Sequence, residues 1–122
     1  MEWSFTSDRP IYLQLMEQIK LGIVAGAYSP GERLPSVREL ATDASVNPNT
    51  MQKALSELER EGLVYSQRTS GRFISEDTAM IDATKQELAL EQVNRFLDTM
   101  ARLGYDRTTT LDLMSRLVGK ED

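Results

Sequence analysis

One face of a predicted helix between Asn47 and Glu61 carries side chains suited to hydrogen bonding with a nucleic acid. These side chains are Asn49, Gln52, Lys53 and Ser56. Their amide and hydroxyl groups can hydrogen-bond base edges, the ammonium can bind phosphate, and no carboxylate interrupts the face. Apolar residues at helical spacing fall on the opposite face, namely Met51, Ala54, Leu55 and Leu58. The pattern predicts a buried apolar face and an exposed face that contacts DNA.

Two residues mark the start of this helix. Asn47 is of a preferred N-cap type, and Pro48 follows at the first helical position, where its missing N–H costs no hydrogen bond. As an N-cap, the Asn47 side chain would accept a hydrogen bond from the backbone of Asn49 or Thr50, which leaves it less free to bind a base. The helix is therefore predicted to begin sharply at Pro48.

A shorter helix is predicted just before it. Ser36 and Glu39 have the spacing of a capping box, and Arg38 lies in the first turn. A cation near a helix N-terminus is unfavourable to the helix dipole, so its placement favours an external anion such as a DNA phosphate. A salt bridge to a nearby carboxylate is the alternative. The short turn around Val46 would hold the two helices at a steep angle, as in a helix-turn-helix motif.

Further elements surround this pair of helices. Apolar residues at helical spacing predict a preceding helix within residues 11–26. Residues 63–65 and 72–74 are short strand-like runs around a polar tip, which predicts a hairpin. Arg68 and Arg72 flank that tip, where they could reach a minor groove or the DNA backbone. Simple solvation of the two arginines is the alternative.

An ordered series of motifs between Pro10 and Glu76 is typical of one protein family. The motifs are Pro30-Gly31, Leu34-Pro35-Ser36, Arg38-Glu39-Leu40-Ala41, Val46 and Leu58-Glu59-Arg60-Glu61-Gly62-Leu63-Val64. Through them the segment resembles the winged helix-turn-helix domain of the GntR family of bacterial transcription regulators. The YtrA-like subfamily is resembled in particular by the short tail and by Asn47-Pro48-Asn49-Thr50 with Lys53.

The resemblance implies a partner, double-stranded operator DNA, and a set of contacts to it. In the family, an arginine in the first turn of the second helix and the first residues of the third helix contact DNA; they correspond here to Arg38, Asn49, Thr50, Gln52 and Lys53. The family's wing usually has the sequence Arg-Gly-x-Gly-x-Phe-Val, whereas here it is Arg68-Thr69-Ser70-Gly71-Arg72-Phe73-Ile74. The predicted DNA-binding residues are in total Arg33, Ser36, Arg38, Asn47, Asn49, Thr50, Gln52, Lys53, Arg68, Gly71 and Arg72. The resemblance also implies control of a neighbouring operon, often one for an ABC transporter.

Composition narrows the class of function. The chain has neither cysteine nor histidine, which removes disulfides, zinc sites of the usual kind, thiol nucleophiles and imidazole catalysis. We therefore expect no catalytic residues, no metal and no cofactor, and an enzyme is a remote alternative. No apolar run reaches the roughly 18 residues of a membrane span, and the N-terminal residues do not resemble a signal peptide, so a cytoplasmic location without a membrane partner is expected.

Net charge opposes a DNA-binding function at first sight. The chain carries −5 at pH 7; residues 1–76 hold 8 Lys and Arg against 10 Asp and Glu, and residues 77–122 hold 6 against 9. Local charge sets a DNA footprint, however, and the cations are concentrated in segments that a winged helix presents to DNA. We expect weak nonspecific binding and a strong dependence on the correct operator. The alternative that the acidic charge favours is a winged-helix protein–protein interaction module without DNA binding.

Residues 77–122 carry two apolar stripes at helical spacing. The stripes predict dimerisation residues at Ala89, Val93, Phe96, Leu97, Met100, Leu103, Leu111 and Met114. Two short amphipathic helices cannot bury such stripes against each other, so a homodimer is the expected solution and packing back onto the winged domain is the alternative. Thr84 and Glu87 have the spacing of another capping box, so residues 78–103 form either one helix or two.

The short tail also bears on ligand sensing. About 45 residues remain after Glu76, which is little material for a dedicated pocket, so an unidentified small-molecule effector would sit at the dimer interface or between the tail and the winged domain. The sequence thus predicts a mainly α protein with a small β-hairpin, made of a winged helix-turn-helix DNA-binding domain at 1–76 and a helical dimerisation tail at 77–122. The predicted function is that of a dimeric transcription regulator, a repressor rather than an enzyme.

Overall fold

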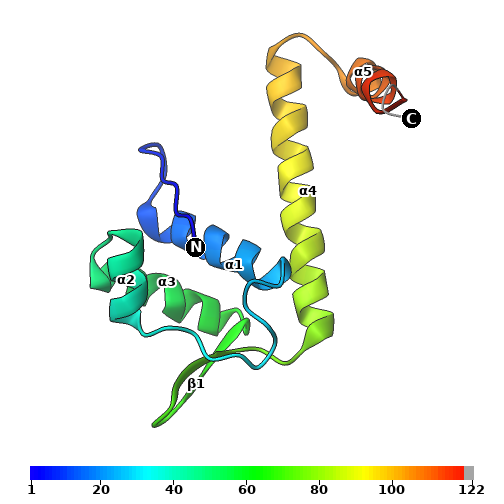
Figure 1. Cartoon of the computed structure of the whole chain (residues 1–122). Coiled ribbons are helices and arrows are strands. Elements are labelled where there is room, and N and C mark those ends of the chain that lie inside the picture. The colour runs from blue at the N-terminus through cyan, green and yellow to red at the C-terminus, as the bar shows by residue number, and fades with distance from the viewer. Residues whose placement is uncertain (120–122) are drawn as a thin grey trace. The chain divides into compact units, whose positions relative to one another are not determined.

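A computed structural model describes residues 1–119 of the chain. In these residues the elements follow in the order α1 (Ile11–Val24), α2 (Val37–Ala44), α3 (Pro48–Arg60), β1 (Val64–Gln67), β2 (Gly71–Ile74), α4 (Thr78–Arg102) and α5 (Arg107–Gly119) (Figure 1). The predicted class, mainly helical with one small hairpin, is confirmed. The chain folds into two compact units, of which the first is Met1–Lys85 and the second begins at Gln86.

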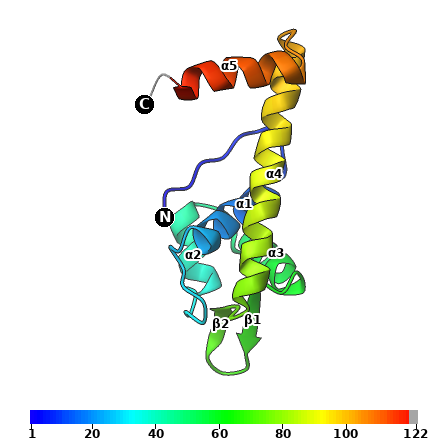
Figure 2. The same cartoon turned by 90° about the vertical axis from the view of Figure 1, so that its right-hand side faces the viewer.

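Three helices of the first unit enclose its core, with the hairpin beside them (Figures 1 and 2). The predicted apolar faces of α1 and α3 are buried, and the fully buried side chains include Leu15, Ile19, Met51, Leu55 and Leu58. Val46 lies in the turn that was expected to hold α2 and α3 at a steep angle. It is half-buried and packs against the same core. The exposed face of α3 therefore points away from this core, as the helical spacing requires.

Side-chain caps fix the starts of α2 and α3. The Ser36 hydroxyl accepts a hydrogen bond from the backbone N–H of Glu39 at 3.1 Å, and the Glu39 carboxylate accepts one from the Ser36 backbone. The Asn47 side chain accepts a hydrogen bond from the backbone N–H of Asn49 at 2.7 Å, with Pro48 in the first helical position. Both predicted caps are confirmed, so the orientation of the helix-turn-helix is set by local hydrogen bonds as well as by the core.

The hairpin pairs β1 with β2 in antiparallel register, with Gln67 opposite Gly71 and Val64 opposite Ile74. The segment before α2 pairs with β2 through a single bridge, in which Arg33 lies opposite Phe73. Gly31 donates its backbone N–H to the Ile74 carbonyl at 2.9 Å, and Leu34 donates to the Arg72 carbonyl at 2.9 Å. Sequence reasoning predicted the hairpin but missed this pairing, because the segment lies between prolines and looks like a loop.

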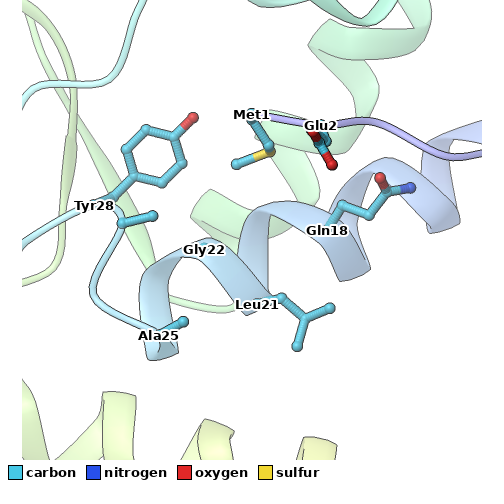
Figure 3. Close-up of a pocket in the computed structure, with 8 residues that line it drawn as sticks. Met1, Glu2, Gln18, Leu21, Gly22, Ala25 and Tyr28 are labelled. Carbon is cyan, nitrogen blue, oxygen red and sulfur yellow. The ribbon is translucent and has the colours of Figure 1, made fainter.

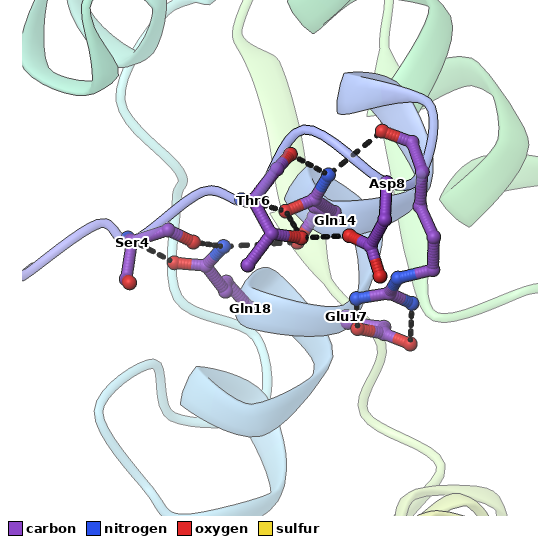
Figure 4. A network of polar contacts seen from close by, with 7 residues as sticks. Ser4, Thr6, Asp8, Gln14, Glu17 and Gln18 are labelled. Carbon is purple, nitrogen blue, oxygen red and sulfur yellow. Dashed lines mark hydrogen bonds and ion pairs between the residues drawn. The ribbon is translucent and has the colours of Figure 1, made fainter.

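The N-terminal arm is the segment that precedes α1, and the sequence made no prediction for it. Within the first unit it is held against α1 by hydrogen bonds (Figure 4). The buried Gln14 side chain of α1 donates to the backbone carbonyls of Thr6 and Arg9 at 2.9 and 2.8 Å, and accepts from the Thr6 N–H at 2.8 Å. Further along the arm, the Trp3 indole donates to the Asp43 carboxylate of α2 at 2.7 Å. The arm thereby links α1 to α2.

The sequence left open whether residues 78–103 form one helix or two. The structure has a single helix of 25 residues there, α4. The Thr84 hydroxyl donates to the Met80 carbonyl at 3.0 Å, inside the helix, and caps no new one. Ile81 is buried in the core of the first unit and Met80 packs against it. For this reason the first compact unit extends to Lys85, beyond the boundary expected from the polar residues near 76.

Candidate nucleic-acid interface

Half of the cations in residues 1–76 are paired with carboxylates. Of the 8 Lys and Arg side chains there, four form ion pairs: Arg9 with Glu17 at 2.8 Å, Lys20 with Glu61 at 2.7 Å, Arg60 with Glu57 at 2.7 Å and Arg72 with Glu59 at 3.4 Å. The other four have no carboxylate partner anywhere in the described residues 1–119. They are Arg33, Arg38, Lys53 and Arg68.

All four unpaired cations are exposed; three lie on the helix-turn-helix or the wing, and Arg33 lies in the segment before α2, in a bridge with Phe73 of the wing. Arg38 is in the first turn of α2, and the salt bridge considered as its alternative role is absent from the described part of the chain. Lys53 is in the second turn of α3, and Arg68 is at the tip of the hairpin. Within residues 1–76, the positive charge that is not paired with a carboxylate therefore lies at the predicted interface.

The outer face of α3 is exposed at Asn49, Gln52, Lys53 and Ser56, as predicted. The Gln52 amide donates to the Ser56 hydroxyl at 3.2 Å, which leaves its carbonyl oxygen and a second N–H available. The Lys53 ammonium lies 3.9 Å from the centroid of the Tyr12 ring. Thr50 is half-buried at the start of the helix.

Two predicted DNA-binding residues, Ser36 and Asn47, are used by the structure as caps. Their hydroxyl and amide oxygens accept hydrogen bonds from backbone N–H groups, so their primary role is to orient the helices that carry the exposed polar side chains. Both remain exposed next to those side chains.

The wing tip is built on Gly71. Its φ of +104° lies in the left-handed region, which L side chains rarely adopt, and a Cβ there would lie 3.2 Å from Arg33 Nε. The Arg33 side chain therefore lies directly against the wing at a position that only glycine leaves open. Thr69, which stands where the family often has glycine, is an exposed turn residue.

Arg72, which was predicted to flank the tip of the wing, lies in β2 just after the turn. It pairs with Ser66 within the hairpin, its side chain is only 19% exposed, and its Nε contacts Glu59 Oε1 at 3.4 Å. The same Glu59 oxygen accepts the Ser66 hydroxyl at 2.7 Å. Sequence reasoning missed this contact, since Glu59 and Arg72 are 13 positions apart and belong to different elements.

A cavity of about 440 Å³ lies between the N-terminal arm and the C-terminal half of α1 (Figure 3). Met1, Gln18, Gly22, Ala25 and Tyr28 are among its lining residues, and no predicted DNA-binding residue lines it. Burial raises the pKa of the Tyr28 hydroxyl, and the nearby Asp43 and Glu32 carboxylates raise it further. The phenol therefore stays neutral and can act as a hydrogen-bond donor in the cavity.

The predicted dimerisation residues are mostly exposed. Val93, Phe96, Leu103, Leu111 and Met114 are between 41% and 67% exposed, and Leu90, which was not predicted, belongs with them at 61%. Ala89 is also exposed, Leu97 is half-buried and Met100 is buried. The described chain by itself thus leaves a broad apolar surface on α4 and α5 in contact with water.

The part of the chain that the structure describes contains neither a candidate metal site nor a candidate membrane-spanning helix. No group of three or more acidic side chains there could hold a metal ion. No helix within residues 1–119 is long and apolar enough to cross a membrane.

Comparison with known proteins decides the family. The sequence profile of bacterial regulatory proteins of the gntR family matches residues 11–74, from the start of α1 to the end of β2. The chain belongs to the GntR family. The match covers all of the elements that carry the unpaired cations.

Two relatives from Bacillus subtilis place this GntR protein in the YtrA-like subfamily. YhcF, an uncharacterized HTH-type transcriptional regulator, is 41% identical over 112 residues, which cover 92% of this chain and 93% of YhcF. The transcriptional repressor YtrA is 43% identical over 93 residues, covering 75% of this chain and 71% of YtrA.

Solved structures agree with this assignment. A GntR family transcriptional regulator from Listeria monocytogenes superposes with a TM-score of 0.82 at 35% identity, covering 92% of this chain and 98% of that one. The DNA-binding domain of AraR, solved in complex with its operator ORX1, matches with a TM-score of 0.57 at 30% identity, covering 62% of this chain and 96% of that one. The chain is therefore a transcription regulator with a winged helix-turn-helix DNA-binding domain, and not an enzyme.

Proposed function

We propose that this GntR regulator is a homodimeric repressor that binds a double-stranded operator near its own gene through α2, α3 and the wing. The observation that carries the proposal is the set of exposed cations without carboxylate partners in residues 1–76, which are Arg33, Arg38, Lys53 and Arg68. In a chain with a net charge of −5, such cations supply the local attraction to phosphate that total charge does not.

In this proposal α3 enters the major groove. Asn49 and Gln52 read base edges, because their amides offer paired donors and acceptors on the exposed face. Lys53 and Arg38 bind phosphates, and Thr50 contributes a hydroxyl near the start of α3. Ser36 and Asn47 act through their caps, which hold α2 and α3 in position.

The wing supplies the remaining contacts. Arg68 at its tip and Arg33 against Gly71 face the minor groove or the adjoining backbone. Arg72 acts through Glu59 to orient the wing against α3 in the free protein, and Gly71 keeps room for Arg33.

The proposed dimer uses the apolar surface of α4 and α5. Residues 1–76 carry DNA binding and residues 77–122 carry dimerisation, with Ile81 tying the first turn of α4 to the core of the winged domain. Two-fold pairing would bring two recognition helices onto half-sites about one helical turn apart. We propose that the repressor controls a neighbouring operon. The resemblance to the family implies that this operon encodes an ABC transporter.

Substitution of cations tests the proposal. The DNA probe is a duplex selected from a random library by the full-length chain, and titrations at several salt concentrations give the salt slope. Arg38→Met and Lys53→Met should each lower the slope by about two, because each removes one phosphate contact from each protomer of the dimer. Arg60→Met is the matched control, since Arg60 is exposed on α3 but already paired with Glu57. If all three variants bind the duplex with the affinity and salt slope of the parent, the proposed interface is contradicted.

A small-molecule effector completes the proposal, at a place that the sequence did not suggest. The cavity beside Met1 and Tyr28 lies within the first unit, is open to solvent, has a volume of about 440 Å³ and is lined mainly by apolar residues. A Cβ on Gly22 would lie 3.0 Å from Met1 Cε and 3.2 Å from Tyr28 Cδ2. Gly22→Ala should therefore press on both side chains and displace part of the cavity lining, and metabolites that raise the unfolding temperature of the parent but not of this variant would be candidates.

A further inference from the structure

We propose that Tyr12 is a positioning residue for DNA binding, because its ring holds the Lys53 ammonium on the exposed surface of α3 without neutralising it. The inference rests on the proposed function, in which Lys53 contacts a phosphate. Tyr12 lies in the first turn of α1, outside the helix-turn-helix and the wing, and none of the predicted contacts included it.

The geometry is that of a cation–π contact. Lys53 Nζ lies 3.9 Å from the centroid of the Tyr12 ring, within the range of about 6 Å at which a cation is attracted to the ring face. The ring is itself anchored, because Tyr12 is half-buried and packs against the core of the first unit. A flexible lysine side chain is thus held by a rigid support that belongs to a neighbouring helix.

The partner of a lysine determines how much of the lysine's charge remains available to DNA. Lys20, which also lies near α3, is paired with Glu61 at 2.7 Å, and such a carboxylate cancels most of the field that a phosphate would feel. An aromatic ring carries no net charge, so Lys53 keeps its full positive charge and its N–H donors that point away from the ring. The contact lowers the conformational freedom of the ammonium before DNA arrives, which reduces the entropy lost on binding.

The test uses the full-length chain and four variants, with a random 30-base-pair duplex and the duplex selected from a library as probes. Lys53→Met keeps the apolar stem and removes the charge, and should lower the salt slope by about two, one phosphate contact for each protomer of the dimer. Tyr12→Leu should weaken binding to both duplexes about two- to tenfold for each winged domain that contacts the duplex, because the lysine side chain then loses its conformational freedom only on binding. Tyr12→Phe keeps the ring and should bind like the parent.

The double variant separates positioning from a direct or purely structural role. If Tyr12 acts through Lys53, then Tyr12→Leu with Lys53→Met should bind like Lys53→Met alone. Tyr12→Leu that binds like the parent, or that loses the same factor in both backgrounds, would overturn the inference. Lys53→Met that leaves affinity and slope unchanged would remove the phosphate contact as well, so failure of the proposed function is distinguishable from failure of the inference alone.

A measurement without DNA tests the contact even if a variant folds poorly, because it can be made on the parent chain. In the parent chain, the ring current of Tyr12 should shift the NMR signals of the Lys53 ε-methylene protons upfield. The shift should persist in Tyr12→Phe. Unshifted protons in the parent would show that the ammonium does not rest on the ring in solution, and would overturn the inference directly.

Discussion

Glu59 near the end of α3 holds Arg72 of the wing, with 3.4 Å between Glu59 Oε1 and Arg72 Nε. The same oxygen accepts the Ser66 hydroxyl from β1 at 2.7 Å, so one carboxylate contacts both strands of the hairpin. This carboxylate has two opposed effects on DNA binding. It orients the wing against α3, but it neutralises one arginine and adds a negative charge close to the surface proposed for phosphate contact.

Replacement of Glu59 by glutamine should raise affinity for nonspecific DNA. The amide removes a negative charge and ends the ion pair with Arg72, so the salt slope for a shuffled duplex should increase by about one for each protomer that contacts it. The free energy of unfolding should fall by less than about 1 kcal/mol, because partly exposed ion pairs contribute little. Glu57→Gln, which affects a pair further from the wing, is the control. If Glu59→Gln binds the shuffled duplex no more tightly than the parent, Arg72 does not reach DNA.

Substitution of Gly71 by alanine should separate backbone strain from displacement of Arg33. A left-handed conformation costs an L residue about 1–2 kcal/mol, so Gly71→Ala should lower the free energy of unfolding by that amount. Operator affinity should fall as well, because the new Cβ would meet Arg33 Nε at 3.2 Å.

Gly26 provides a matched control for this substitution. Its φ is +85°, and nothing lies within 4 Å of a Cβ placed there. Gly26→Ala should therefore cost similar stability in denaturant titrations and leave DNA binding unchanged. Equal losses of operator affinity in both variants would mean that stability, and not the position of Arg33, explains the effect of Gly71→Ala.

The cap at Asn47 predicts different effects for two substitutions. Asn47→Ala removes the acceptor for the Asn49 N–H, now seen at 2.7 Å, and should cost about 1 kcal/mol of stability. Asn47→Asp keeps an acceptor but adds a negative charge at the start of α3, so it should fold normally and bind operator less tightly than the parent. Thermal unfolding and operator titration distinguish the two. An Asp variant with parental affinity would place Asn47 far from the DNA.

The start of α5 should depend on pH. Hydrogen bonds from Thr109 lower the pKa of Asp106, whose carboxylate accepts the Thr109 backbone N–H at 2.8 Å. Because the pKa is lower in the folded state, the carboxylate contributes its stability above the ordinary value of 3.8 and loses it as the pH falls through the folded value. The Thr109 amide signal should report this loss in an acid titration by NMR. Asp106→Asn keeps an acceptor and should abolish the pH dependence of that signal, and an unchanged titration would contradict the role of Asp106.

Local sequence signals predicted most of the fold. Helical spacing and the Ser36 and Asn47 caps located α1, α2 and α3 to within a few residues, because these signals act between positions three or four apart. The hairpin followed from two strand-like runs around a turn. The same reasoning predicted the exposed face of α3, where side chains on opposite faces of one helix differ in polarity.

Contacts between distant segments could not be predicted in this way. Trp3 and Asp43 are 40 positions apart and belong to segments with unrelated local patterns. Which arginines are free is also a tertiary property: Arg72 and Arg68 flank the same turn in sequence, but only Arg72 reaches Glu59. The first compact unit extends past residue 76 to Lys85 for a similar reason, since the burial of Ile81 depends on a core formed by other elements.

The apolar surface of the tail gives the last prediction, which concerns oligomeric state. Phe96 is 41% exposed in the described chain and lies on the same face of α4 as Val93 and Leu103. If that face forms a two-fold interface, Phe96→Asp would bury an unpaired carboxylate there and should convert the dimer to a monomer. Asn94 is exposed on the opposite side of the same helix turn, so Asn94→Asp adds the same charge outside the interface and is the matched control.

Operator binding should change together with oligomeric state. A monomer presents one recognition helix, so it loses the gain in affinity that comes from tethering two heads to two half-sites, a factor that can reach about 10²–10⁴. Phe96→Asp should therefore bind the selected duplex far more weakly than the parent while keeping its affinity for a single half-site, and Asn94→Asp should match the parent on both probes. Sedimentation velocity and DNA titration on the three proteins check this. A parent chain that sediments as a monomer and still binds the selected duplex with the affinity of two half-sites would refute the dimer, and the exposed face of α4 would then need another partner.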